Sequence, residues 1–307
     1  MVAIPFTENV IPQLLAWRAA GLKSALVTLV GIDGSSPRRI GSQMAVNENG
    51  EHLGYISSGC AEAAIVAEAA AAIEAGAART VCYGAGSKYI DVVLPCGSGI
   101  DVHFDPTVTT ADLEDVQAAI SARRPALLEI ALAPGNMADK QAFVRHYNPA
   151  PRIVIAGRGV AVDYVAAFAR QLDWDVVAAS PDEATLARVA PVANSVQYLT
   201  KPGDFDPTII DAQSAVVLLF HDHEWEPPIL ARCAATPAFY FGALGSRRTH
   251  AQRTQMLEMA GCPADFIASI RSPVGLDIGA MNPPEIALAI IAQIMARTPT
   301  SKDERCG

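Results

Sequence analysis

The 307-residue sequence lacks an excess of positive charge, because 32 acidic residues outnumber 23 basic ones and leave a net charge of −9. A chain this acidic is unsuited to nucleic acid or to anionic membrane surfaces, so we expect neither as a partner. The sequence also lacks an apolar run long enough to cross a bilayer, since glutamates interrupt the alanine-rich stretch 61–75. Its composition, 51% hydrophobic and 18% charged, is that of a globular protein.

Paired cysteines are missing as well. The six cysteines form no C-x-x-C pair and no zinc-finger spacing. The first residues show neither the charged nor the apolar region of a secretory signal, so we expect reduced thiols and a cytoplasmic location.

Two of the cysteines stand out because glycine lies next to each of them. Cys60 follows Gly59, and Cys96 precedes Gly97. A neighbouring glycine lets a ligand approach both the backbone and the thiol. Cys60 also precedes an expected helix, whose N-terminal partial charge would lower the thiol pKa. Both cysteines are therefore candidate soft ligands or nucleophiles, with a buried inert thiol as the alternative.

The first half of the chain, residues 1–148, predicts a mixed α+β domain. A helix is expected over 61–75, ending before Gly76. Residues 47–50 contain an Asn-Gly pair between two apolar runs, which predicts a hairpin. Two prolines within residues 148–151 favour an extended linker after this half.

The second half, residues 152–297, predicts strict alternation of strands and helices. Strands are expected at 152–156, 175–179, 215–220 and 238–243. This alternation is typical of a parallel sheet covered on both faces. The predicted fold class is therefore α/β, an N-terminal mixed α+β domain followed by a Rossmann-like domain with a parallel sheet. Residues 298–307 are polar and predict a flexible tail.

The second half opens with part of a dinucleotide-binding pattern. Gly157 and Gly159 follow an expected strand and precede an expected helix, which is the context of a phosphate-binding turn. Val162 occupies the position of the third glycine, and Ser180 ends the next strand where an NAD enzyme usually has Asp or Glu. An NAD(P)-dependent oxidoreductase is therefore one alternative function.

Three further segments carry groups that suit a ligand: the loop Ser36–Gly41 with Arg38, the segment His221–His223, and the turn Gly245-Ser246-Arg247. The first is a glycine-bounded basic loop, and arginine recognises phosphate or pterin by bidentate hydrogen bonds. The second follows a strand at the edge where α/β sheets bind ligands, and it favours a metal or cleft-lining role. The third opens a helix, where amides and arginines bind phosphate. Solvated turns and helix caps are the alternatives.

Taken together, the motifs resemble the XdhC/CoxI family, the accessory proteins of molybdenum hydroxylases such as xanthine dehydrogenase. The matching segments are Gly34–Met44, Ser58–Glu62, Cys96–Gly97, Gly157–Gly159, Phe241–Arg248, Pro273–Ala280 and Pro284–Ala287. They cover about residues 24–105 and 152–296. Three positions depart from the common family pattern: Ser58 and Ser98 replace glycines, and Val160 replaces a histidine.

The resemblance implies a non-catalytic chaperone for the molybdenum cofactor, which is a molybdopterin in mono- or dinucleotide form. Such a protein favours the sulfurated cofactor together with a cysteine desulfurase and passes it to the apo-enzyme of a molybdenum hydroxylase. A homodimer is also expected. A sulfurtransferase that carries persulfide on Cys60 or Cys96 is a further alternative.

The resemblance also implies a set of site residues. Cys60 and Cys96 would be thiolate ligands of the molybdenum. The residues expected around the cofactor are Ser36, Arg38, Gly41, Gly59, Cys60, Glu62, Cys96, Gly97, Gly157, Gly159, His221, Gly245, Ser246 and Arg247.

Overall fold

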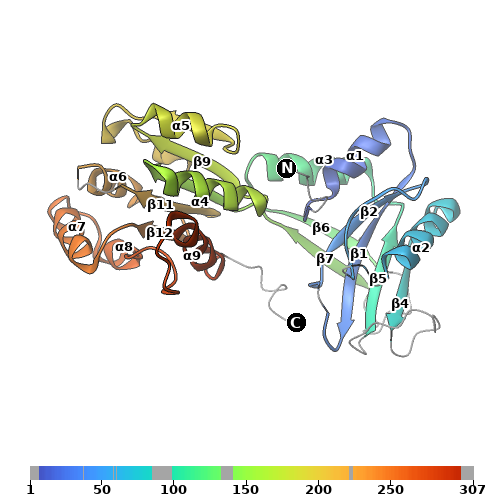
Figure 1. Ribbon diagram of the computed structural model, residues 1–307. Helices are drawn as coiled ribbons and strands as arrows, with labels where there is room; N and C mark the ends of the chain where they lie inside the picture. Colours follow the sequence, from blue (N-terminus) through green and yellow to red (C-terminus); the bar gives the residue numbers. More distant parts are fainter. Residues whose placement is uncertain are drawn as a thin grey trace. The chain divides into compact units, whose positions relative to one another are not determined.

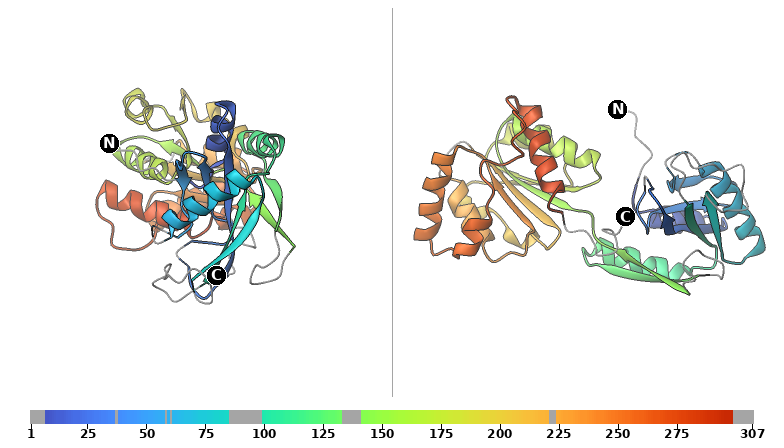
Figure 2. Two further views of the ribbon diagram at one scale, coloured as in Figure 1. Left: turned by 90° about the vertical axis from the view of Figure 1, so that its right-hand side faces the viewer. Right: turned by 90° about the horizontal axis from the view of Figure 1, so that it is seen from below.

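The computed structural model describes residues 7–36, 38–57, 59, 61–84, 99–132, 141–220 and 224–298. The chain divides into two compact units, Met1–Pro149 and Ala150–Pro299. Each unit has its own central sheet and its own hydrophobic clusters (Figures 1 and 2). Within the described parts of the chain, no helix is long and apolar enough to cross a membrane.

The first unit is built on a five-stranded antiparallel sheet of order β3-β2-β1-β5-β4. Its strands are β1 (Ser24–Asp33), β2 (Gln43–Asn47), β3 (His52–Gly54), β4 (Arg79–Gly84) and β5 (Gly99–Asp105). The Asn-Gly turn joins β2 to β3, as the sequence predicts.

Helix α2 (Glu62–Ala75) covers one face of this sheet and ends at Gly76, whose φ of 61° is left-handed. Its Ile65 packs among Met44 and Phe104 of the sheet. The other face is covered by α1 (Ile11–Ala19), α3 (Thr110–Ser121) and the hairpin of β6 (Ala126–Ala131) and β7 (Ala142–Tyr147). The sheet therefore lies between two layers (Figure 1).

The second unit is a parallel sheet of order β10-β9-β8-β11-β12. Its strands are β8 (Arg152–Gly157), β9 (Asp175–Ser180), β10 (Ser195–Tyr198), β11 (Ser214–Leu219) and β12 (Tyr240–Ala243). The strand order reverses between β8 and β11, as in doubly wound folds. The expected parallel sheet is confirmed.

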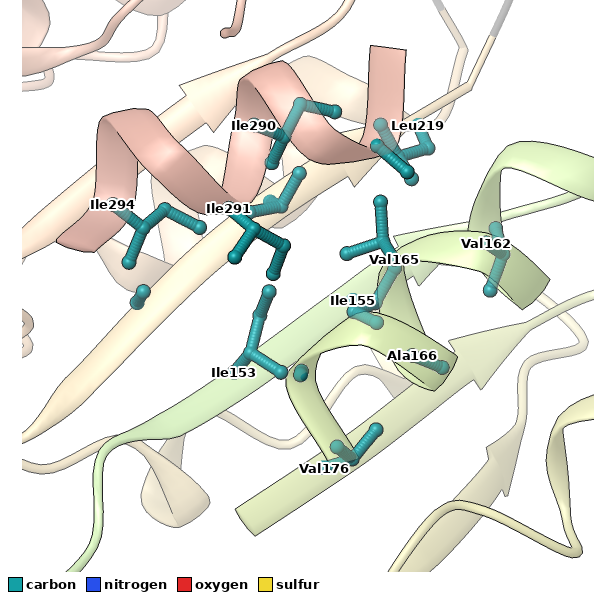
Figure 3. Packing of buried hydrophobic residues seen from close by; sticks show 14 of the residues in the cluster. Ile153, Ile155, Val162, Val165, Ala166, Val176, Leu219, Ile290, Ile291 and Ile294 are labelled. Atoms are coloured by element: carbon teal, nitrogen blue, oxygen red, sulfur yellow. The ribbon is translucent and has the colours of Figure 1, made fainter. Parts of the chain in front are cut away.

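Helices cover both faces of this parallel sheet. One layer contains α4 (Val160–Gln171), α5 (Glu183–Val189) and α9 (Pro283–Met295), and its core joins Ile155, Val165 and Ile291 (Figure 3). The other contains α6 (Glu226–Cys233), α7 (Arg247–Met259) and α8 (Ala264–Ser269). Two short 3-10 turns, η1 (Pro202–Asp204) and η2 (Pro207–Ile209), follow β10.

Three short elements, β10, α5 and α8, were not predicted from the sequence. β10 is a four-residue edge strand, and three of its residues are exposed. α5 and α8 have seven and six residues, too few to show a helical apolar period. These elements form because they pack against an existing sheet, which local pattern does not reveal.

Candidate functional site

Three connections leave the antiparallel sheet of the first unit in the same direction. β1 and β3 both run antiparallel to β2, so the chain leaves Asp33 and Gly54 on the same side. β4 pairs with β5 up to the Gly84–Gly99 pair, and Asp33 of β1 also pairs with Gly99. Three connections therefore start from one end of the sheet: the glycine-rich loop, residues 34–41, after β1, the segment after β3, and the connection between β4 and β5.

Four expected site residues, Cys60, Cys96, Gly97 and His221, lie outside the described residues, as does most of the expected tail, residues 299–307. Some residues near these positions are described. Gly59 and Ala61 flank Cys60, and Gly99 follows the segment that contains Cys96.

Glu62 ties the segment that carries Cys60 to the start of α2. Its buried carboxylate accepts hydrogen bonds from the backbone N–H of Ile56, Ser57 and Gly59, at 3.2, 2.7 and 2.6 Å. It also accepts the Ser57 hydroxyl at 2.6 Å, while the Ser57 Oγ accepts the Ala61 N–H at 2.7 Å. The carboxylate is thus saturated by its own loop, which makes Glu62 a positioning residue.

The protonation state of Glu62 follows from these contacts. Burial alone would raise the pKa of the carboxyl, but the hydrogen bonds from Ser57 and from the backbone outweigh burial and lower it. Glu62 is therefore ionised at neutral pH. Gly59, with a φ of 107°, adopts a backbone conformation that favours glycine, directly before Cys60.

In the glycine-rich loop, the residues that were expected to bind the cofactor make contacts within the protein. The Ser36 Oγ accepts the Arg38 N–H at 3.2 Å, and the Arg38 guanidinium donates to Glu8 at 3.0 Å. Gly41 is buried with a φ of 87°, and a Cβ there would lie 3.2 Å from the Cδ of Arg145. Gly41 therefore makes room for Arg145, a cation from β7 that belongs to none of the predicted motifs.

A row of polar side chains, three of them buried, crosses the same sheet. In register across β2, β1, β5 and β4 lie Gln43, Thr28, His103 and Thr80. Gln43 donates to Thr28 at 3.1 Å and accepts the Tyr147 hydroxyl at 2.8 Å. The His103 Nδ1 lies 2.9 Å from the Thr80 hydroxyl, and burial lowers the pKa of His103. Its Nε2 has no partner among the described residues.

Cys82 and Asp101 form a cross-strand pair two residues further along β4 and β5 from Thr80 and His103, toward the loops. Burial, together with the charge and hydrogen bond of Asp101, raises the pKa of the Cys82 thiol, so this cysteine stays protonated. Cys233 in the second unit is fully buried, and burial raises its pKa to about 12. Neither environment favours a thiolate.

In the second unit, the predicted turns follow strands on either side of β11. Gly157 ends β8 and Gly159 lies just after it, Gly245-Ser246-Arg247 follows β12, and β11 lies between the two strands. They therefore lie along the carboxyl edge of the sheet, where open α/β sheets bind ligands. Gly157 permits close approach of β8 to β11, since a Cβ would lie 2.7 Å from the carbonyl oxygen of Leu219.

The first of these turns is occupied by the chain itself. The Gly159 N–H donates to the Thr185 hydroxyl at 3.0 Å, and this hydroxyl in turn donates to Asp182. Val162, at the third glycine position, is fully buried in the core, and the buried Ser180 hydroxyl accepts the Asp182 N–H. The Gly159 amide and the end of β9 at Ser180 would hold a dinucleotide in a nucleotide-binding protein. Here both make hydrogen bonds within the protein.

The second turn is a capped helix start with an exposed arginine. The Ser246 Oγ accepts the Thr249 N–H at 3.2 Å, and Gly245 has a φ of 120°. The Arg247 side chain is exposed and makes no polar contact with other described residues. Arg247 therefore remains available to an anion.

Arg253 holds this turn in place, a role that the sequence did not reveal. Its guanidinium is fully buried and donates to Glu226 of α6, to the carbonyl oxygen of Leu244 at 2.6 Å and to the Ser272 hydroxyl at 3.0 Å. One side chain thus joins α6, the turn before α7 and the segment before Pro273. A fully buried arginine is the exception among arginines, so composition gives no signal for it.

Two family models match this chain. The XdhC Rossmann domain matches residues 153–294, and the XdhC and CoxI family matches residues 17–84. The Escherichia coli (strain K12) protein named molybdenum cofactor insertion chaperone PaoD is 31% identical over 297 residues, which cover 94% of this chain and 87% of PaoD. The chain belongs to the XdhC and CoxI family. The resemblance inferred from the sequence motifs is thereby confirmed.

Two further proteins are less similar to this chain. A protein of Bacillus subtilis (strain 168) that bears the name of a probable xanthine dehydrogenase subunit is 22% identical over 327 residues, which cover 89% of this chain and 92% of that protein. A crystal structure of a xanthine dehydrogenase from Bacillus halodurans matches with a TM-score of 0.78 at 23% identity, over 94% of this chain and 95% of that one. The latter similarity supports the fold.

Proposed function

We propose that this XdhC/CoxI chain is a chaperone that binds the molybdenum cofactor as cargo and inserts it into an apo-enzyme of the xanthine dehydrogenase type. The observation that carries the proposal is the 31% identity to PaoD across most of both chains. PaoD is named a molybdenum cofactor insertion chaperone, and the two proteins align over both units.

The loops at one end of the antiparallel sheet support a cargo site in the first unit. Cys60 and Cys96 belong to segments that start from this end, and thiolates are soft ligands suited to a metal such as molybdenum. Arg145 adds positive charge beside the loop that contains Gly41, which suits the phosphate of the pterin. Arg38 of the same loop is paired with Glu8. Glu62 would not touch the cargo; it holds the backbone around Cys60.

In the second unit, the turn Gly245-Ser246-Arg247 supports a phosphate contact better than the turn at Gly159. Arg247 is available, whereas the Gly159 amide donates to Thr185. The same contact argues against the alternative of an NAD(P)-dependent oxidoreductase, because that amide is a main donor to a dinucleotide pyrophosphate.

The proposed function also includes the sulfur of the cofactor and two partner proteins. Cys60 and Cys96 would carry or protect the sulfurated form of the cofactor. A cysteine desulfurase would be the sulfur source, and a molybdenum hydroxylase would be the recipient. All three proteins would meet in the cytoplasm.

The proposal is tested by producing the full chain in a host that makes the cofactor. Molybdenum is measured by mass spectrometry, and pterin by fluorescence of its oxidised derivative. We expect both in equal amounts in the wild-type protein and a loss of both in Cys60→Ala and Cys96→Ala, with Cys262→Ala as the matched control. A wild-type protein that contains neither and does not bind added cofactor overturns the proposal.

A further inference from the structure

A cavity of about 560 Å³ opens in the first unit, at the end of the antiparallel sheet that lies away from the candidate cargo loops. Strand β1 begins beside this cavity at Ser24 and reaches those loops at Asp33, whereas β5 starts at the loops and ends just before Pro106. The cavity is lined by the turn from α1 to β1, the end of α2 and the segment from β5 to α3. Its volume is in the range of sites for small organic ligands.

Two cationic side chains, Arg18 and Lys23, line this cavity, although the chain as a whole has a net charge of −9. Arg18 donates from Nε to the Ser24 hydroxyl at 3.3 Å, and from Nη1 to the Val108 carbonyl at 2.8 Å and the Thr110 hydroxyl at 3.3 Å. Its Nη2 atom makes no hydrogen bond with any described residue, and the exposed Lys23 ammonium makes none either. Both cations therefore keep donors for an anion.

The contacts of Arg18 fix its guanidinium at the cavity wall. Burial is the largest influence on the pKa of this group and lowers it, so the guanidinium is partly withdrawn from water while it stays charged at neutral pH. Partly buried charges are screened less than exposed ones. An anion beside Arg18 is therefore attracted more strongly than one on the open surface.

The carboxylates near the cavity leave both cations without a salt bridge among the described residues. Glu48 accepts the backbone N–H of Lys23 at 3.0 Å, and the Asp105 Oδ1 accepts two backbone N–H groups of the loop that follows it. Glu74 is the one acid among the described lining residues, and its side chain is exposed. It is expected to weaken an anion at this place without neutralising either cation.

The backbone groups at the cavity add donors and few open acceptors. Helix α3 begins here, and the N–H groups of Thr110 and Ala111 have no acceptor among the described residues. Helices α1 and α2 end here, but their last carbonyls accept N–H groups of the turns that follow, including Gly21 and Gly76. The positive end of α3 thus supplements the two cations.

Apolar side chains form the rest of the lining, and they include Leu22, Ile73 and Val108. A phosphate ion alone would fill only a small part of the volume, so the cavity fits a phosphate that carries an organic group. Two cations and several N–H donors suit a doubly charged tetrahedral group better than a single carboxylate.

We propose that this cavity is a binding site for a small organic phosphate. Lys23 and the Nη2 atom of Arg18 contact the phosphate, and the apolar side chains contact the organic group. The site is separate from the proposed cargo site, because none of its described lining residues belongs to the loops that contain Cys60 and Cys96. It therefore stands whether or not the chain carries the molybdenum cofactor.

Isothermal titration calorimetry of the full-length protein at low ionic strength tests the ligand class, with phenyl phosphate as the probe. We expect saturable binding at one site with a dissociation constant below about 1 mM. Inorganic phosphate lacks the organic group and benzoate lacks the second charge, so each should bind about fivefold more weakly or worse. Phenol, which has no charge, should give no binding heat.

Variants of the lining residues test the place of binding. Lys23→Gln and Arg18→Gln should each weaken phenyl phosphate binding about fivefold, and Glu74→Gln should strengthen it about twofold. Arg124→Gln is the matched control, because the exposed Arg124 lies past the other end of α3 and should not change binding. Cys60→Ala and Cys96→Ala should also leave it unchanged. Lys23 is exposed, so its variant keeps the test valid even if Arg18→Gln lowers stability.

Chemical acetylation gives an independent readout at Lys23. Saturating phenyl phosphate should slow acetylation of Lys23, measured by peptide mass spectrometry, and should leave the exposed Lys201 of the second unit unaffected.

Four results would overturn the proposal. They are a wild-type protein that does not bind phenyl phosphate, binding that Lys23→Gln leaves unchanged, benzoate that binds as tightly as phenyl phosphate, and binding that is lost in the cysteine variants. The last result would assign the phosphate to the cargo loops.

Discussion

The Glu62 carboxylate and the Ser57 hydroxyl lie 2.6 Å apart and close a hydrogen-bonded ring around the segment that contains Cys60. The same carboxylate accepts three backbone N–H groups, so a single side chain fixes the approach to this cysteine. The arrangement gives Glu62 a physical role, because this acid holds the described residues on either side of Cys60.

Replacing Glu62 by Gln should destabilise the first unit by about 2 kcal/mol, since charge-assisted hydrogen bonds are lost and an amide group faces backbone donors. Urea unfolding measures the loss, and cofactor retention should fall with it. Glu74→Gln is the matched control, because Glu74 lies on the same helix and is exposed. Equal stability of the two variants would show that Glu62 does not hold the loop.

The lowered pKa of Glu62 predicts a pH dependence of stability. The pKa in the folded protein lies below the ordinary value of 4.5, so the unfolded chain binds more protons in that range. The stabilising contribution is therefore complete above pH 4.5 and is lost as pH falls through the folded pKa. The difference in unfolding free energy between wild type and Glu62→Gln should shrink on acidification. A difference that stays constant from neutral pH to strongly acidic pH would contradict this account.

Gly59→Ala should cost about 1 to 3 kcal/mol, because the φ of 107° is unfavourable for a side chain. A Cβ at Gly59 meets no described atom within 4 Å, so backbone strain is the source of the cost. Thermal unfolding measures it. Gly203→Ala is the control, since Gly203 has equally open surroundings without a positive φ. A Gly59→Ala protein as stable as that control would remove the strain argument.

The buried pair Arg253–Glu226 predicts strongly non-additive mutations. Arg253→Met alone should cost about 3 to 5 kcal/mol, because it leaves a buried carboxylate without its cation. Adding Glu226→Gln should restore part of that loss, as measured in a double-mutant cycle of unfolding free energies. Additive losses would mean that the two side chains stabilise the second unit independently.

The fold was largely predictable because apolar periodicity reports the long elements. The alternation after residue 151 predicted the parallel sheet, and the Asn-Gly pair predicted the β2–β3 hairpin. The short elements β10, α5 and α8 were missed, since their formation depends on packing.

The sequence motifs showed which loops belong to the candidate site, but they did not show which contacts the side chains in those loops make. Glycine and cysteine patterns identify loops, but they do not show that Glu62 binds its own loop or that Thr185 occupies the Gly159 amide. The burial and internal contacts of Arg253, and the polar row with His103, were not predicted because burial of polar groups depends on tertiary partners.

The central claim is that the full chain binds the molybdenum cofactor through the thiols beside Gly59 and Gly97. Anaerobic equilibrium dialysis of the cofactor-free protein against isolated cofactor tests this claim most directly. We predict saturable binding by the wild type and by Cys262→Ala, with affinity reduced about tenfold or more in both Cys60→Ala and Cys96→Ala. Binding that is absent in the wild type, or unchanged in both cysteine variants, would contradict it.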